Sequence, residues 1–145
     1  MSQQQRARPS HWRHLLGALV ETVLAALTLA AAEAGDVDTT TIEATFTDDV
    51  TATDYAAGVT IKVNAVAQTI SSATRQINHA LVHFVIAAAA DIDDTITWEY
   101  DDDFGDYQDA LGNPMGDVAA TPATNYIGSH VYYDTADCSA WLGAT

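Results

Sequence analysis

The sequence has very little positive charge and almost no cysteine. Five Lys and Arg residues stand against 20 Asp and Glu residues, so the formal net charge is −15. A chain of this charge repels phosphate backbones, and we therefore expect no nucleic-acid partner. Cys138 is the only cysteine. It excludes an internal disulfide and a cysteine-based zinc site.

Sequence signatures of common catalytic sites are also missing. The chain has no G-x-S-x-G motif, no P-loop and no Rossmann glycine pattern. Cys138 and the nearby His130 have no third residue in the sequence that would orient them for nucleophilic catalysis. We therefore expect a protein that is not an enzyme and uses no cofactor.

What the sequence does have is enough apolar mass for one folded domain. It contains 145 residues, of which 48% are hydrophobic and 17% charged. This length fits a single domain, and this composition is not that of a disordered chain.

The charge is distributed unevenly along the chain. Residues 1–20 contain Arg6, Arg8 and Arg13 and no acid, whereas Lys62 and Arg75 are the only bases after residue 36. Most of the acids are Asp, and such an Asp-rich, Lys-poor surface is typical of halophilic proteins, which stay soluble in concentrated salt. An ordinary acidic, solvated surface is the alternative interpretation.

The apolar stretch of residues 15–32 predicts an N-terminal α-helix. It is rich in Ala and Leu, Pro9 and Ser10 precede it, and Gly35 follows it. Residues 1–35 are accordingly expected to form a basic lead and this helix. A secretory signal is one interpretation, because residues 32–34 match the A-x-A cleavage pattern, although Glu21 interrupts the apolar run. A membrane span is disfavoured, because 18 residues is short for a bilayer.

A docking helix is the third interpretation of the same stretch. Large side chains recur at spacings of three and four, and they form one broad stripe opposite small and polar residues. Such a stripe suits packing against a partner or against copies of the same chain, and the alternative is a helix folded onto its own domain. The residues expected to contact a partner are Trp12, Leu16, Val20, Val23 and Leu27.

Beyond residue 36 the pattern changes to short alternating runs, which predict an all-β sandwich over residues 36–127. Ile96, Trp98 and Tyr100 share one face of a strand, and Trp98, Phe84 and Val82 are expected in the core. The apolar run of residues 80–87 predicts a central strand covered on both faces. Strands are expected at residues 40–46, 59–64, 68–72, 80–87, 94–100 and 121–127.

Five segments of this region carry a family resemblance. In chain order they are TIEATFTDD, AGVTIKVN, DDTITWEYD, YQDALGNPMGDV and ATNY. Together they resemble the bacterial immunoglobulin-like repeat of large surface and swimming-motility proteins. The most specific piece runs from Asp109 to Pro114 and is similar to the D-x-x-G-N loop of that family. The chain departs from the pattern at Asn64-Ala65, where the family has Asn-Gly, and in the acidic insertion of residues 101–106.

The resemblance implies an immunoglobulin-like β-sandwich with a structural or adhesive role. A single copy behind an N-terminal helix looks like a virion protein, such as a phage capsid decoration or cement protein or another head or tail accessory. Its partners would be its own copies and a capsid or other virion protein. The alternative is a secreted or membrane-anchored surface protein, extracellular or on the cell surface, with residues 1–34 as signal or anchor.

Two groups of side chains invite a metal interpretation. His79 and His83 have a spacing suited to one face of a helix, but on a strand they lie about 13 Å apart, too far to share an ion. Five carboxylates in residues 101–109 offer calcium ligands without the spacing of an EF-hand, and a solvated acidic loop is the favoured interpretation. We therefore expect no metal site. The five carboxylates are those of Asp101, Asp102, Asp103, Asp106 and Asp109.

The C-terminal tail, residues 128–145, is rich in aromatic side chains. It is expected either to add a last strand to the sandwich or to contact a neighbouring subunit through Tyr132, Tyr133 and Trp141.

Overall fold

Nine β-strands form the regular structure of residues 25–128, the part of the chain that the computed structural model describes. They are β1 (Leu29–Ala34), β2 (Thr41–Phe46), β3 (Val59–Val63), β4 (Val66–Ala67), β5 (Ile70–Arg75), β6 (Leu81–Ile86), β7 (Ile96–Tyr100), β8 (Val118–Pro122) and β9 (Thr124–Asn125).

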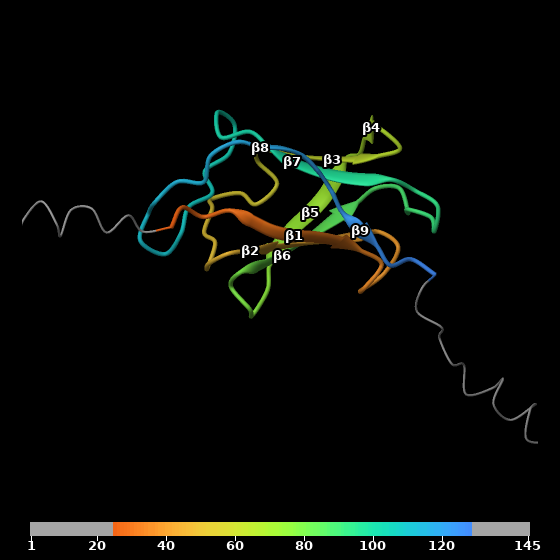
Figure 1. Ribbon diagram of the computed structural model, residues 1–145, viewed down its shortest axis with the longest axis horizontal. Coiled ribbons are helices and arrows are strands. Elements are labelled where there is room, and N and C mark those ends of the chain that lie inside the picture. Colours follow the sequence, from red (N-terminus) through yellow and green to blue (C-terminus); the bar gives the residue numbers. More distant parts are fainter. Residues whose placement is uncertain (1–24, 129–145) are drawn as a thin grey trace, which may run out of the picture.

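The strands build two sheets that lie face to face as two layers (Figure 1). One sheet has the order β5-β6-β2-β1-β9 and the other the order β4-β3-β7-β8. All pairs are antiparallel except β1 with β9, which is parallel. Strand β8 belongs to the second sheet and β9 to the first, so the chain crosses between the layers at Ala123.

The core lies between the layers because each central strand alternates apolar and polar side chains. Ile96, Trp98 and Tyr100 of β7 are buried, while Thr97 and Glu99 between them are half-exposed. Val82 and Phe84 of β6 face them from the other sheet and are also fully buried. The predicted β7 faces and the three predicted core residues are confirmed.

Aromatic rings fill the middle of this core. The ring of Trp98 meets those of Phe46 and Phe84 edge to face, at centroid distances of 6.0 and 6.2 Å. Tyr100 stacks on Trp98 and contacts Tyr107 at 4.8 Å. Such aromatic pairs stabilise beyond the area they bury. Burial raises the pKa of the hydroxyls of Tyr100 and Tyr107, so both rings remain neutral at physiological pH.

The predicted N-terminal helix is wrong where the structure can test it. No helix occurs within residues 25–128, and residues 29–34 form β1, which pairs with β2 along its whole length. Ala and Leu favour helices by only a few tenths of a kcal/mol per residue, and pairing with β2 outweighs that preference. The sandwich therefore includes residues that precede the boundary expected at residue 36. Residues 15–24 of the predicted helix lie outside the described part.

The remaining predicted strands agree with the structure in varying degree. Strands β2, β3, β6 and β7 fall within one or two residues of their predicted bounds. The strand predicted at residues 68–72 is displaced from the observed one. Strand β5 starts two residues later, at Ile70, and residues 66–67 form the separate short strand β4. The predicted strand at 121–127 is wrong as one element, since it divides into the end of β8 and β9 at the crossing. Strand β6 is buried on one face only, with the other half-exposed, which corrects the prediction of cover on both faces.

Candidate functional site

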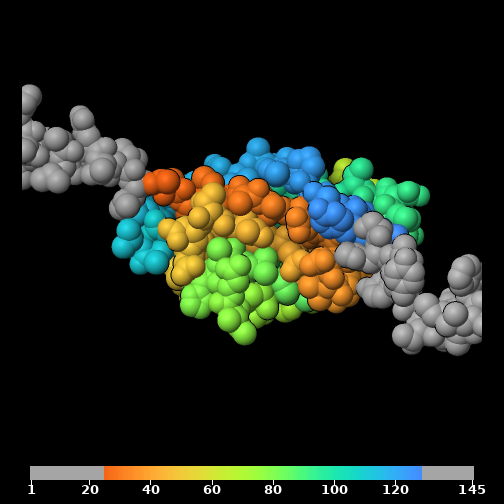
Figure 2. Space-filling view, turned by 60° about the horizontal axis from the view of Figure 1, so that its bottom comes forward, coloured from red at the N-terminus to blue at the C-terminus, as the bar shows by residue number. Residues whose placement is uncertain are grey.

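The described surface has a groove between β1 and β8, with a volume of about 510 Å³. In the space-filling view the segment of β8 and β9 runs beside β1 (Figure 2). The groove thus lies between a strand of one sheet and a strand of the other. We call this hollow the β1–β8 groove. Its lining residues are Thr28, Leu29, Ala30, Ala31, Ala32, Asp117, Val118, Ala119, Thr121, Pro122 and Thr124.

Two strand edges form the walls of this groove. Strand β1 pairs with β9 only at Glu33 and Ala34, so residues 29–32 have no strand on that side within the described part of the chain. Strand β8 is the last strand of its sheet and pairs with β7 alone. Pro122 is the last residue of β8, and the N–H of Ala123 after it still donates to the carbonyl of Ile96 on β7 at 2.8 Å. The ring nitrogen of Pro122 therefore faces the outer side of the strand, where it offers no hydrogen-bond donor.

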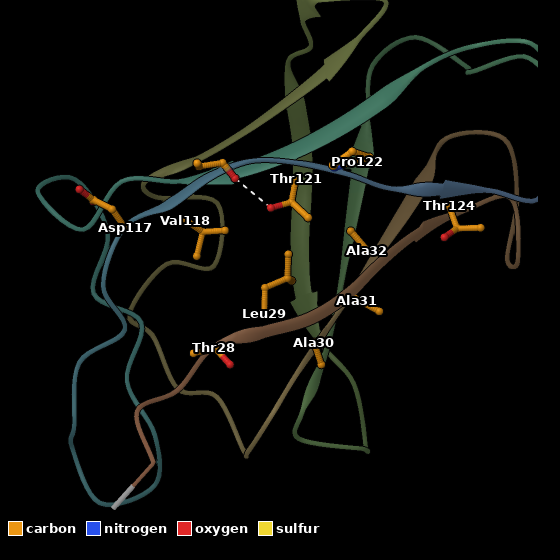
Figure 3. Close-up of a pocket in the computed structure, with 11 residues that line it drawn as sticks. Thr28, Leu29, Ala30, Ala31, Ala32, Asp117, Val118, Thr121, Pro122 and Thr124 are labelled. Carbon is orange, nitrogen blue, oxygen red and sulfur yellow. Dashed lines mark hydrogen bonds between the residues drawn. The ribbon is translucent and has the colours of Figure 1, made fainter. Parts of the chain in front are cut away.

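The side chains in the groove are small and mostly apolar (Figure 3). Three consecutive alanines come from β1, and Val118 and Ala119 face them from β8. The Thr121 hydroxyl donates a hydrogen bond of 2.9 Å to the carbonyl of Ala119 on its own strand. Asp117 is the single ionisable residue in the lining. One carboxylate among methyl groups suits contact with another polypeptide rather than acid–base chemistry.

Asp117 also belongs to a small acidic cluster at the end of the groove. Carboxylate oxygens of Asp101, Asp102 and Asp117 lie within 4.8 Å of one another, and all three residues are exposed. The backbone N–H of Asp102 donates to the Asp117 carboxylate at 2.9 Å. A hydrogen bond with Asp117, together with its charge, raises the pKa of the Asp102 carboxyl. Exposed acidic groups of this kind are common without a bound ion.

Other carboxylates of the acidic loop hold its backbone. Asp106 accepts hydrogen bonds of 3.0 Å from the N–H of Thr53, which lower the pKa of its carboxyl. Asp109 is buried, and it accepts hydrogen bonds from the side chain and N–H of Asn113 and from the N–H of Leu111. These bonds lower the pKa of Asp109. Asp101 likewise accepts a hydrogen bond of 3.0 Å from the N–H of Asp103. Three of the five predicted carboxylates are therefore acceptors of backbone hydrogen bonds.

The two histidines contact different carboxylates. His79 Nδ1 lies 3.4 Å from an oxygen of Asp49, and His83 Nε2 lies 2.6 Å from an oxygen of Glu43. Glu43 and His83 are cross-strand partners on β2 and β6. The two histidines of the H-x-x-x-H spacing thus belong to two separate histidine–carboxylate pairs.

The structure describes one of the predicted partner-contact residues. Leu27 is 2% exposed and packs in the core just before β1, so its assignment to an exposed helix face is wrong. The other predicted contacts lie outside the described residues. They are Trp12, Leu16, Val20 and Val23 in the N-terminal segment and Tyr132, Tyr133 and Trp141 in the tail.

Sequence reasoning missed the groove and Asp117. No spacing could reveal the groove, because its walls come from opposite ends of the domain sequence. The alanines of β1 favour a helix, so their sequence did not indicate a strand. Asp117 lies eight residues after Asp109, the last carboxylate of the acidic loop, and it carries no motif of its own.

Comparison with models of protein families, with curated proteins and with solved structures finds no match for this chain.

None of the described residues belongs to a helix long and apolar enough to span a membrane.

Proposed function

We propose that this protein is a non-enzymatic structural protein of a virion, a phage capsid decoration or cement protein or another head or tail accessory. Its sandwich is immunoglobulin-like. Its N-terminal segment docks it onto copies of itself and onto a capsid or other virion protein.

The order of the strands is the observation that supports the immunoglobulin-like part of this proposal. In immunoglobulin domains, strands A, B, E and D form one sheet and strands C, F and G the other, with C′ added in variable-type domains. Strands β1, β2, β6 and β5 follow the first order, and β4, β3, β7 and β8 follow the second. Such domains serve widely as binding and structural modules, so the site rather than the fold must define the role.

The segments that resemble the bacterial repeat fall on matching elements. TIEATF is β2, and the other strand motifs contain β3, β7 and β9. The D-x-x-G-N piece forms a tight loop, in which Asp109 accepts the backbone hydrogen bonds and Gly112 has a φ of 84°. A left-handed φ of this size favours glycine. The segments that carry the resemblance therefore have identifiable structural roles, as strands or as a tight loop. This supports the immunoglobulin-like assignment.

The chemistry of the described surface supports a structural role. The β1–β8 groove contains one ionisable residue, and each described histidine contacts its own carboxylate. General acid–base catalysis needs a titratable side chain held within hydrogen-bond reach of the reacting group, with a pKa near the operating pH. An interaction with another protein uses the small side chains and strand edges that are present.

The position of β1 argues against one form of the surface-protein alternative, in which a signal is cleaved after Ala34. Cleavage after Ala34, at the A-x-A pattern, would remove all of β1 and leave β2 paired with β6 alone. It would also remove Leu27, Ala32 and Ala34 from the core. A processed protein with this sandwich would need a cleavage site before residue 25.

The docking role can be tested in the full chain with two charged substitutions. Val20→Asp with Val23→Asp places charge on the predicted stripe, whereas Thr22→Asp places charge on its opposite side. Sedimentation velocity should show that the double variant loses the oligomer while Thr22→Asp keeps it. Equal mass distributions for both variants would contradict docking through this stripe.

A further inference from the structure

The β1–β8 groove exposes two strand edges to one space. Among the described residues, positions 29–32 of β1 and the outer side of β8 have no strand partner. An unpaired edge offers backbone N–H and C=O groups to any extended segment that fits beside it. Two such edges facing one groove could both be covered by a single inserted strand.

Each edge has only part of the protection that natural edge strands use, which includes lysine, inward-pointing charge, proline, a β-bulge or a covering segment. Pro122 protects one end of β8, and a register shift between Leu29 and Ala31 interrupts β1. The other edge positions are Ala31 and Ala32 of β1 and Val118, Ala119, Ala120 and Thr121 of β8. The small side chains there leave the space of about 510 Å³ that makes up the groove. These positions are open to pairing with another segment.

We propose that the C-terminal segment of the same chain, residues 129–145, lies in the β1–β8 groove as an extended strand. The described part ends at Gly128, three residues after β9, and Thr124 of β9 lines the groove. Gly128 has a φ of 76°, a conformation that favours glycine and allows the chain to reverse direction. The segment therefore starts after Gly128, which lies four residues, about 13 Å of extended chain, beyond the end of the groove that Thr124 lines.

The length of the segment fits this path. Extended chain covers about 3.3 Å per residue, so the six residues of β1 span roughly 20 Å. The 17 residues after Gly128 can span up to roughly 56 Å. Cys138 is ten residues beyond Gly128, about 33 Å along an extended chain, which brings it level with the first residues of β1. Trp141 then lies past the groove, near the end where residue 25 enters the sandwich.

The composition of the segment also fits. Val131, Tyr132 and Tyr133 are strong strand formers, and residues 129–145 contain no Lys or Arg. Alternation along a strand would turn one tyrosine toward the alanines and the other toward solvent. A covalently attached segment has a high effective concentration at the groove, which favours it over the tail of a second copy. This proposal does not depend on the proposed virion role.

Crosslinking to the natural Cys138 tests this proposal in the full chain. Ala30→Cys and Ala119→Cys each place one thiol at an exposed position of the groove. Ser71→Cys is the matched control, because Ser71 is exposed on β5 at the opposite edge of its sheet. Each variant is treated with a short bis-maleimide, and circular dichroism checks its fold.

We expect crosslinks at monomer mass for both groove variants, with a yield several-fold above that of Ser71→Cys. Cys138→Ser should abolish them. Crosslinks found mainly at dimer mass would show the tail of a second copy in the groove and overturn the assignment to the same chain. Yields no higher than that of Ser71→Cys would overturn occupation of the groove by this segment.

Discussion

At the residue scale, the turn between β3 and β4 contains local strain. Asn64 and Ala65 form a two-residue hairpin loop, and both have positive φ, 51° and 65°. This is the conformation for which Asn-Gly is the preferred pair. Asn64 tolerates it and accepts hydrogen bonds from the N–H and hydroxyl of Thr95. Ala65 has a Cβ that clashes in this conformation. The turn therefore keeps the backbone conformation that the Asn-Gly pair favours, and the alanine in place of glycine destabilises it.

We predict that Ala65→Gly stabilises the protein by about 0.5–1 kcal/mol, because relief of the left-handed strain exceeds the added entropy of the unfolded chain. Ala67→Gly, two residues along in β4, has no such strain to relieve and should destabilise by a similar amount. Urea unfolding measures both. A loss of stability in Ala65→Gly as large as that in Ala67→Gly would contradict the strained turn.

A second prediction at this scale concerns acid. The hydrogen bonds from Asn113 and Leu111 lower the pKa of Asp109 in the native state. Their stabilisation is therefore complete above the unfolded pKa of about 3.9, and it is lost as the pH falls through the lower native pKa. Asp109→Asn should lower the urea midpoint at pH 7 and reduce its fall between pH 4 and pH 2. Asp103→Asn removes the same charge from the same loop without these bonds, and an equal effect there would contradict the capping role.

At the element scale, β7 organises the core. Trp98 is fully buried at its centre and contacts Phe46 and Phe84 of the opposite sheet and Tyr100 of its own strand. The period-two pattern was sufficient to predict this strand and its faces, because one side of β7 is core and the other half-exposed.

Trp98→Ala should therefore destabilise the protein by about 3–5 kcal/mol, through lost burial and the cavity left behind. Trp98→Phe keeps much of the ring volume and should cost clearly less. The denaturant midpoint at unchanged slope reports the difference. A cost under about 1 kcal/mol for the alanine variant would place Trp98 outside the core.

Elements whose identity depends on distant partners were not predictable in the same way. Local composition favours a helix at β1, and the antiparallel pairing with β2 that overrides it involves residues 8 to 17 positions away. Strand β8 begins at Val118 with two alanines and ends at a proline, so it has no apolar alternation to detect. Since these two strands wall the groove, the candidate site was invisible for the same reason that its strands were.

At the scale of the whole molecule, charge dominates the response to solvent. A net charge of −15 opposes compaction by self-repulsion, and salt screens that repulsion. The carboxylates of the acidic loop that hold backbone groups, Asp101, Asp106 and Asp109, need no cation for that role.

We predict that sodium chloride raises the melting temperature and that millimolar calcium adds nothing beyond matched ionic strength. Differential scanning calorimetry at equal ionic strength separates screening from binding, because a bound ion raises the melting temperature in proportion to the logarithm of its concentration. A rise with the logarithm of calcium concentration that sodium at equal ionic strength does not produce, lost in Asp117→Asn and kept in Asp103→Asn, would instead make Asp101, Asp102 and Asp117 a metal site.

The proposed virion role is tested most directly by where the protein is found in a culture of its source. Particles are purified on a density gradient and analysed by quantitative mass spectrometry beside the cell-envelope and secreted fractions. The proposal predicts that the chain, with the N-terminal segment from Trp12 onward present, peaks with the nucleic-acid-containing particles in fixed ratio to the major capsid protein. A peak in the envelope or secreted fraction, with none in the particles, would contradict it and favour the surface-protein alternative.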